Sequence, residues 1–141
     1  MKIYFFYIAI LFAMASLGCG SGEPKQHEIS VQEADNAVRA AYSQFVDVRT
    51  PEEYLAGHAD RAVNIPLDTL EANLDRLKKN EPVYLICQSG NRSQTAADIL
   101  TQAGFTKAVS VAGGTPAWQA AGLPMSDRPP SRPVAKPSVG N

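Results

Sequence analysis

The sequence predicts an α/β fold: a single domain whose parallel sheet is flanked by helices on both faces. Short apolar runs at residues 45–48, 62–66, 83–87 and 108–111 alternate with segments that carry helical signals. Strands alternating with helices in this way are typical of a parallel sheet. The run VYLIC at 83–87 is continuously apolar, which indicates a strand buried on both faces.

Two capping-box patterns mark helix starts in the first half of this region. SVQE at residues 30–33 predicts a helix that runs to about Tyr42, before the strand FVDV. TPEE at residues 50–53 predicts a short helix, with proline at its first position and Gly57 at its end. A strand, AVNIP, follows.

The second half predicts three more helices. Leucines at positions 67, 70, 74 and 77 share one helical face, so a helix is expected to continue to about Lys79. After the strand VYLIC, residues 93–103 form a helix that Gly104 stops. The strand AVSV then leads into a glycine turn and a last short helix within residues 113–122. The folded domain is therefore expected to span residues 28–124.

The composition excludes several functions. With 13 Lys and Arg against 14 Asp and Glu, the chain has no strong attraction for nucleic acid. Its two cysteines and two histidines are scattered and do not form a metal-binding set. The sequence has no glycine-rich nucleotide fingerprint either, so neither a metal nor a cofactor is expected.

The first 18 residues are typical of a secretory signal, because one lysine precedes a short apolar run that ends in small residues. The ending SLGC resembles the lipobox of bacterial lipoproteins, in which Cys19 would become the lipid-bearing first residue. Ser16 stands where a lipobox usually has leucine. The expected location is the bacterial cell envelope, with the protein anchored to the membrane by lipid alone and facing the periplasm or exterior. An ordinary cleaved signal, giving a soluble periplasmic or secreted protein, is the alternative.

The two ends of the mature chain are expected to lie outside the domain. Residues 19–27 have the composition of a flexible tether. Residues 125–141 are rich in proline and poor in apolar residues, which predicts a disordered tail. A disulfide between Cys19 and Cys87 is an alternative role for the two cysteines. It would, however, link the tether to a segment whose residues are typical of a reactive site.

That segment is the loop after the strand 83–87. Cys87 closes the strand, and ligand sites of parallel sheets lie at the carboxyl ends of strands. The loop can curl its amides toward one point, and the helix that follows adds its positive end. Such a loop would bind an anion and hold the pKa of Cys87 below that of a free thiol. The alternative is a cysteine that only packs in the core. The loop residues are Gln88, Ser89, Gly90, Asn91 and Arg92.

Three segments together resemble the rhodanese family, in the family's order: DVRTPEEYLAGHADRAVNIP, CQSGNRS and GGTPAWQAAGLP. The resemblance covers residues 28–124 and implies a single-domain sulfurtransferase. Cys87 would attack the outer sulfur of thiosulfate or a similar small anion, become a persulfide, and pass that sulfur to cyanide or a thiol. The amides of residues 88–92 would hold the sulfur and the donor. A monomer is expected.

The same resemblance suggests supporting residues. Asp47 and Arg49 match the family's DxR motif and are interpreted as an ion pair that braces the site. His58 is interpreted as structural, because most such histidines satisfy backbone groups. Glu53 has a sufficient role as a helix cap, and Trp118 is expected to anchor the core.

Two other functions compete with sulfur transfer. Cysteine phosphatases and arsenate reductases share this fold type but have five residues between cysteine and arginine, whereas four separate Cys87 from Arg92. The shorter loop should hold sulfur better than a phosphoryl group. A silent rhodanese module that binds a partner or senses sulfur or oxidants is the other alternative, although silent members often lack the loop cysteine.

Overall fold

The computed structural model describes residues 27–40 and 43–128. The predicted signal segment, Cys19, nearly all of the tether and the tail beyond residue 128 lie outside this part. Five strands form one sheet in the order β1-β6-β5-β2-β4, and all the pairs are parallel. They are β1 (Glu28–Ile29), β2 (Gln44–Asp47), β4 (Val63–Asn64), β5 (Val83–Ile86) and β6 (Ala108–Val111).

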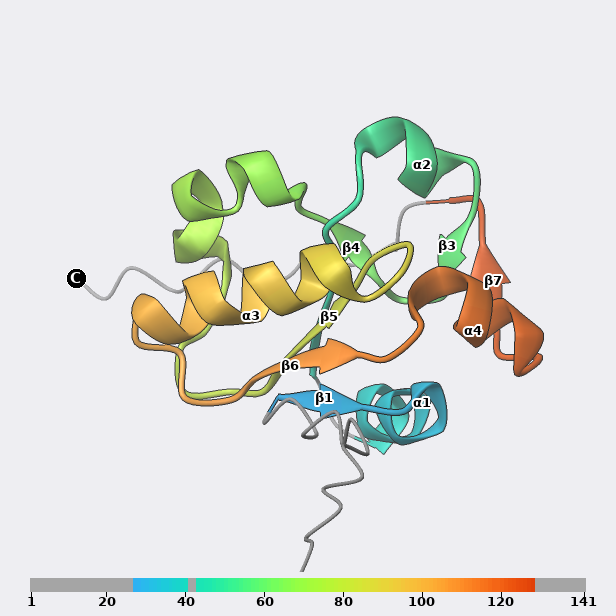
Figure 1. The fold of residues 1–141 in the computed structure, drawn as a ribbon, viewed down its shortest axis with the longest axis horizontal. Coiled ribbons are helices and arrows are strands. Elements are labelled where there is room, and N and C mark those ends of the chain that lie inside the picture. The colour runs from blue at the N-terminus through green and yellow to red at the C-terminus, as the bar shows by residue number, and fades with distance from the viewer. Residues whose placement is uncertain (1–26, 41–42, 129–141) are drawn as a thin grey trace, which may run out of the picture.

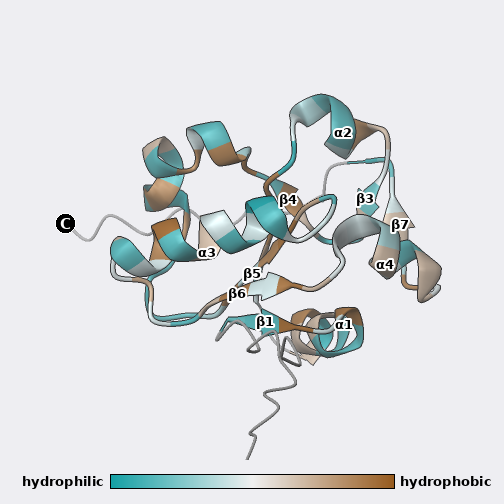
Figure 2. Cartoon of the chain, viewed as in Figure 1, coloured by the Kyte–Doolittle hydropathy of each residue, from teal (hydrophilic) through white to brown (hydrophobic). Residues whose placement is uncertain are grey.

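Helices cover both faces of this sheet, as predicted (Figure 1). On one face α3 (Asn91–Gln102) and two 3₁₀ segments, η1 (Leu67–Thr69) and η2 (Glu71–Arg76), enclose one apolar core. On the other, α1 (Val31–Ala40) and α4 (Gly114–Ala120) enclose a second core. Figure 2 shows β4 and β5 in hydrophobic colours between these layers. None of the helices in the described ranges has the length and apolarity needed to cross a membrane.

The capping boxes are present where the sequence predicts them. Thr50 and Glu53 cap α2 (Pro51–Leu55) reciprocally, and Ser30 and Glu33 do the same for α1. Helix α1 is described as far as Ala40, and residues 41–42, where its end was expected, lie outside the described part. Both boxes rely on side chains three residues apart, so they can be predicted from local sequence.

The predicted single helix over residues 67–79 is wrong. The segment forms η1 and η2, and Asn73 lies within η2 with the non-helical angles φ −118° and ψ 17°. The Asn73 side chain donates to the carbonyl of Thr69 at 2.8 Å, and such local bonds compete with regular helix. The apolar face was predicted correctly, because Leu70 and Leu77 are buried against the α3 core.

The predicted domain end at Pro124 is also too early. Met125–Ser126 forms β7, which pairs antiparallel with β3 (His58–Ala59) in a second, two-stranded sheet. Met125 packs against the core that contains Trp118. Trp118 is 1% exposed, as expected of a core anchor, and its indole Nε1 donates to the Pro124 carbonyl at 2.9 Å. The fold therefore continues to at least Arg128.

Candidate active site

Cys87 directly follows β5, the central strand of the sheet, at the carboxyl end where α2, α4 and β7 gather (Figure 1). It has no exposed surface, whereas Gln88 and Ser89 after it are exposed. Gly90 has a left-handed φ of +94° and precedes α3 as its cap. Helix α3 thus begins at Asn91, two residues earlier than predicted, and the loop is correspondingly short.

The sulfur of Cys87 receives several hydrogen bonds. The Gly90 amide donates to Sγ at 3.1 Å and the Ser93 amide at 3.4 Å, while the Ser93 hydroxyl lies 3.4 Å from it. Burial raises the pKa of Cys87, but hydrogen bonds from the Ser93 side chain and from the amides of Ser93, Ser89 and Gly90 together lower that pKa below its usual value. The direction agrees with the sequence prediction.

Two buried serines behind the sulfur were not predicted. Ser93 Oγ lies 2.8 Å from Ser110 Oγ on β6 and donates to the Gly90 carbonyl at 3.0 Å. Both serines are fully buried. A polar residue at a buried position of the apolar run AVSV is the one signal that could have indicated Ser110. The two hydroxyls hydrogen-bond each other and so place polar groups behind the thiol in an otherwise apolar layer.

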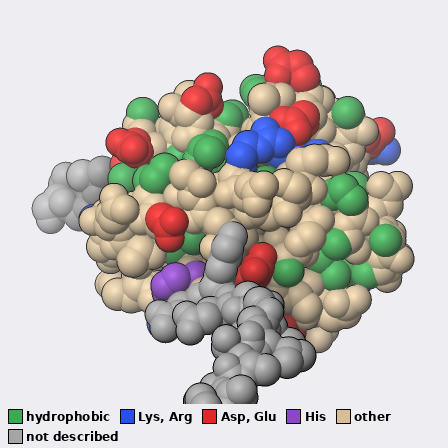
Figure 3. Space-filling model, in the orientation of Figure 1, with side chains coloured by type: hydrophobic (Ala, Val, Ile, Leu, Met, Phe, Trp, Pro, Cys, Tyr) green, Lys and Arg blue, Asp and Glu red, His purple; other side chains and the backbone are tan. Residues whose placement is uncertain are grey.

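The guanidinium of Arg92 is paired with a carboxylate on α2. Its two terminal nitrogens donate to both oxygens of Glu53, each at 2.7 Å. This fork lowers the pKa of Glu53 to about 2, although partial burial opposes the shift. Figure 3 shows basic and acidic side chains in contact on this face of the molecule. Glu53 thus both caps α2 and ties it to α3.

The predicted ion pair of Asp47 and Arg49 is present and buried. Arg49 Nη2 lies 2.7 Å from Asp47 Oδ2 and also donates to the Gly57 carbonyl at 2.8 Å. The ring of His58 stacks on Tyr54, with 3.6 Å between the ring centroids. Its nitrogens lie 2.8 Å from the Tyr54 carbonyl and 3.1 Å from that of Arg128. These contacts join the end of β2 to β3 and the C-terminal segment, which are structural roles.

The start of α4 holds the other side of the loop. The amide of Thr115 donates to the Cys87 carbonyl at 2.8 Å, and its hydroxyl lies 3.3 Å from the same oxygen. Gly114 has φ +62°, and a Cβ there would overlap the carbonyl oxygens of Cys87 and Gln88. The segment GGTP therefore fits the loop only with glycine at this position.

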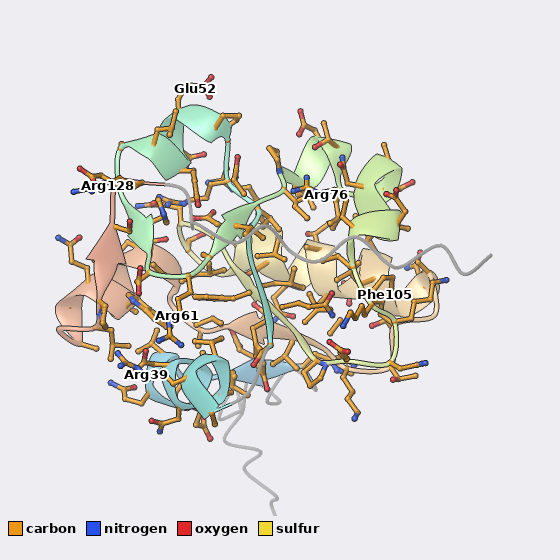
Figure 4. The ribbon with its side chains drawn as sticks, turned by 180° about the vertical axis from the view of Figure 1, so that it is seen from behind. Arg39, Glu52, Arg61, Arg76, Phe105 and Arg128 are labelled. Atoms are coloured by element: carbon orange, nitrogen blue, oxygen red, sulfur yellow. The ribbon has the colours of Figure 1, made fainter. Side chains whose placement is uncertain are left out.

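A cleft of about 740 Å³ opens beside the loop. Figure 4 shows Arg128 at the end of β7, on the side of the molecule where α2 carries Glu52. Residues from the loop, both short helices and the C-terminal segment line the cleft, among them Arg49, Glu53, Gln88, Thr115, Gln119 and Arg128. Within the described ranges, no three His, Cys, Asp or Glu side chains group closely enough to hold a metal ion.

The fold and this site define an α/β domain with a buried cysteine, whose pKa is lowered by hydrogen bonds, at the carboxyl end of its central strand. The chain belongs to the rhodanese-like domain family, whose sequence model matches residues 30–121. That match includes the loop and every helix described above.

Relatives and solved structures agree with this assignment. The chain is 34% identical over 113 residues to the uncharacterized protein YqhL of Bacillus subtilis, covering 79% of this chain and 90% of that protein. It is 36% identical over 108 residues to thiosulfate sulfurtransferase 16, chloroplastic, of Arabidopsis thaliana, covering 68% and 89%. A rhodanese-related protein from Thermoplasma volcanium superposes with a TM-score of 0.66 at 29% identity, covering 72% and 99%.

Proposed function

We propose that this protein is a sulfurtransferase that moves a sulfane sulfur from a small sulfur-containing donor to a thiol or cyanide through a persulfide on Cys87. The observation that carries the proposal is the set of hydrogen bonds to Cys87 Sγ, from the Gly90 amide and from Ser93. They lower the pKa of the thiol at the position where a parallel sheet places its ligands. The sulfurtransferase name of a relative supports the same chemistry.

The first step can be written with thiosulfate as donor. The Cys87 thiolate attacks the outer sulfur, a new S–S bond forms, and the bond between the two sulfurs of thiosulfate breaks. Sulfite leaves with that electron pair, so that three negative charges stand on each side. Because Cys87 itself is buried, the outer sulfur reaches it past the exposed Gln88 and Ser89. Amide donors already aimed at Cys87 Sγ stabilise the negative sulfur without reorganisation.

In the second step a thiolate or cyanide attacks the outer sulfur of the persulfide. The Cys87 thiolate is the leaving group, and its lowered pKa makes it a better one. Cyanide leaves as thiocyanate and a thiol leaves as its persulfide. The cysteine then returns to its starting state.

Mass spectrometry of the intact domain tests the proposal. Treatment with a sulfane donor should add the mass of one sulfur atom, and cyanide should remove it. Cys87→Ser should abolish both steps and keep the fold, because serine has nearly the same size. If the reduced wild-type domain gains no sulfur from any sulfane donor near neutral pH, it is instead a non-catalytic module for binding or sensing.

A further inference from the structure

Three arginines near the active-site loop each have a carboxylate partner. Their charges cancel in pairs, which are Arg49–Asp47 at 2.7 Å, Arg92–Glu53 at 2.7 Å and Arg128–Asp127 at 3.6 Å. The thiolate of Cys87 then adds one negative charge. An incoming anion therefore meets amide donors at this site. It meets no net positive charge from these described side chains.

Glu53 is the carboxylate that neutralises the arginine of the loop. It lines the cleft together with Gln88, and its side chain is about one third exposed. Both of its oxygens occupy the nitrogen fork of Arg92, the group that would otherwise bind an oxyanion. Because the pKa of Glu53 is about 2, the carboxylate stays charged wherever the thiolate exists.

We propose that Glu53 determines the charge of the sulfur donor, so that the site favours singly charged or neutral sulfane-sulfur compounds over the thiosulfate dianion. This inference rests on the proposed function and narrows its donor class. Without the Glu53 carboxylate the charge of Arg92 would attract an anionic donor. By cancelling that charge Glu53 removes more attraction from a dianion than from a monoanion, since Coulomb energy follows the product of the two charges. Asp47 cannot act in the same way, because it is fully buried and held by Arg49. Asp127 also lines the cleft, but its side chain is 80% exposed, so solvent and salt screen its charge.

Two donors that differ by one charge provide the test. Thiosulfate carries two negative charges and methanethiosulfonate carries one, and in both the transferred sulfur is bound to a sulfonyl sulfur. With methanethiosulfonate, the thiolate attacks that outer sulfur and methanesulfinate leaves with the electron pair. The same bond breaks in both reactions, so a difference in rate reports mainly on the non-reacting end of the donor.

The variant Glu53→Gln removes the charge and keeps the shape. Glutamine can close a capping box as glutamate does, so α2 retains its start. The ratio of kcat/KM for thiosulfate to kcat/KM for methanethiosulfonate, with cyanide as acceptor, should rise about three- to tenfold in the variant. Glu33→Gln is the matched control, because it makes the same change in the capping box of α1 on the other face of the sheet. Its ratio should equal that of the wild type.

Salt provides a second measurement, made on both proteins. The Cys87 thiolate repels both donors in either protein, but only the wild type has Arg92 neutralised, so the ratio should increase more steeply with ionic strength in the wild type than in Glu53→Gln. An equal salt dependence in the two proteins, or a ratio that Glu53→Gln leaves unchanged, overturns the role of Glu53. An equal gain for both donors also overturns it, since a structural effect on access to Cys87 would treat the two alike. If neither donor loads the wild type, the proposed function fails instead.

Discussion

At the scale of single residues, hydrogen bonds stabilise the thiolate, and among the described residues no lysine or arginine is bonded to the sulfur. Ser93 donates its amide to Cys87 Sγ, and its hydroxyl lies 3.4 Å from the same sulfur. Ser110 holds that hydroxyl from the neighbouring strand at 2.8 Å. The reactivity of the cysteine should therefore depend on a buried hydroxyl pair.

Ser93→Ala tests this dependence. The loss of the hydroxyl should move the pKa of Cys87 upward, so that less thiolate is present near pH 7 and alkylation by iodoacetamide becomes several-fold slower. The pH profile of the alkylation rate should shift to higher pH. The Gly90 carbonyl also loses a donor, so stability should fall by about 1–2 kcal/mol. An unshifted profile would mean that the backbone amides alone set the pKa.

Ser110→Ala is the comparison, because this hydroxyl contacts Ser93 rather than the sulfur. It should shift the alkylation profile less than Ser93→Ala does. A larger shift from Ser110→Ala would contradict a direct role of Ser93.

Cys87 and its lowered pKa could be predicted because strand, loop and helix are consecutive in the sequence. The partners of the loop could not. Arg92 and Glu53 lie 39 positions apart, and Ser93 and Ser110 lie 17 apart. Residue types alone did not show that Arg92 meets a carboxylate rather than an anionic donor. Such pairings follow from the strand order, which one sequence does not give.

At the scale of elements, two short helices hold the loop from opposite sides. Helix α2 reaches α3 through the Glu53–Arg92 fork, and α4 reaches the Cys87 carbonyl through Thr115. Neither helix is longer than 7 residues, so their positions depend on these contacts and on packing rather than on intrinsic helix stability.

Gly114→Ala should damage this arrangement more than a left-handed φ alone explains. The added Cβ would overlap two carbonyl oxygens of the loop, and we expect a loss of more than about 2 kcal/mol in unfolding free energy. Gly122→Ala is the matched control, since Gly122 has φ +68° but a Cβ added there would meet no described atom within 4 Å. It should cost only about 1 kcal/mol. Urea unfolding of both variants measures the difference. Equal losses of unfolding free energy would show that the loop can shift to make room for the added Cβ.

Local chemistry explains which elements were predictable. Capping boxes and continuous apolar strands rely on neighbouring residues, and they were predicted within one or two positions. The segment 67–79 failed because leucine spacing reports the buried face but not the helix type. Strands β1, β3 and β7 are only two residues long, too short for any periodic signal, and each exists through its pairing partner.

At the scale of the whole molecule, the C-terminal segment belongs to the domain. Ending the chain after Pro124 removes β7 and the Arg128 carbonyl that His58 contacts, so unfolding free energy should fall by about 1–3 kcal/mol. Ending it after Arg128 should change little, because residues 129–141 are rich in proline and poor in apolar side chains. Thermal or urea unfolding of the two truncated chains decides this. A full-stability chain ending at Pro124 would show that β7 is dispensable.

The N-terminal segment carries a separate proposal about location. From the sequence SLGC we propose that the mature protein begins at an acylated Cys19 and stays with the membrane fraction. Mass analysis of the mature protein from a bacterial host should show the lipid on that cysteine. Cys19→Ser should release the domain from the membrane fraction, and an unmodified terminus at another residue would indicate a plain secreted protein.

The strand order also governs when the domain can form during synthesis. Strand β1, at the edge of the main sheet, pairs with β6, where Glu28 lies opposite Ser110, and β2 pairs with β5 across the segment that contains α2, η1 and η2. Contacts that join residues roughly 80 positions apart make folding slow. A nascent chain cannot complete this sheet until β6 has been made. A chain that crosses a membrane unfolded could therefore complete the sheet only after its first 111 residues had passed, with 30 residues still to follow.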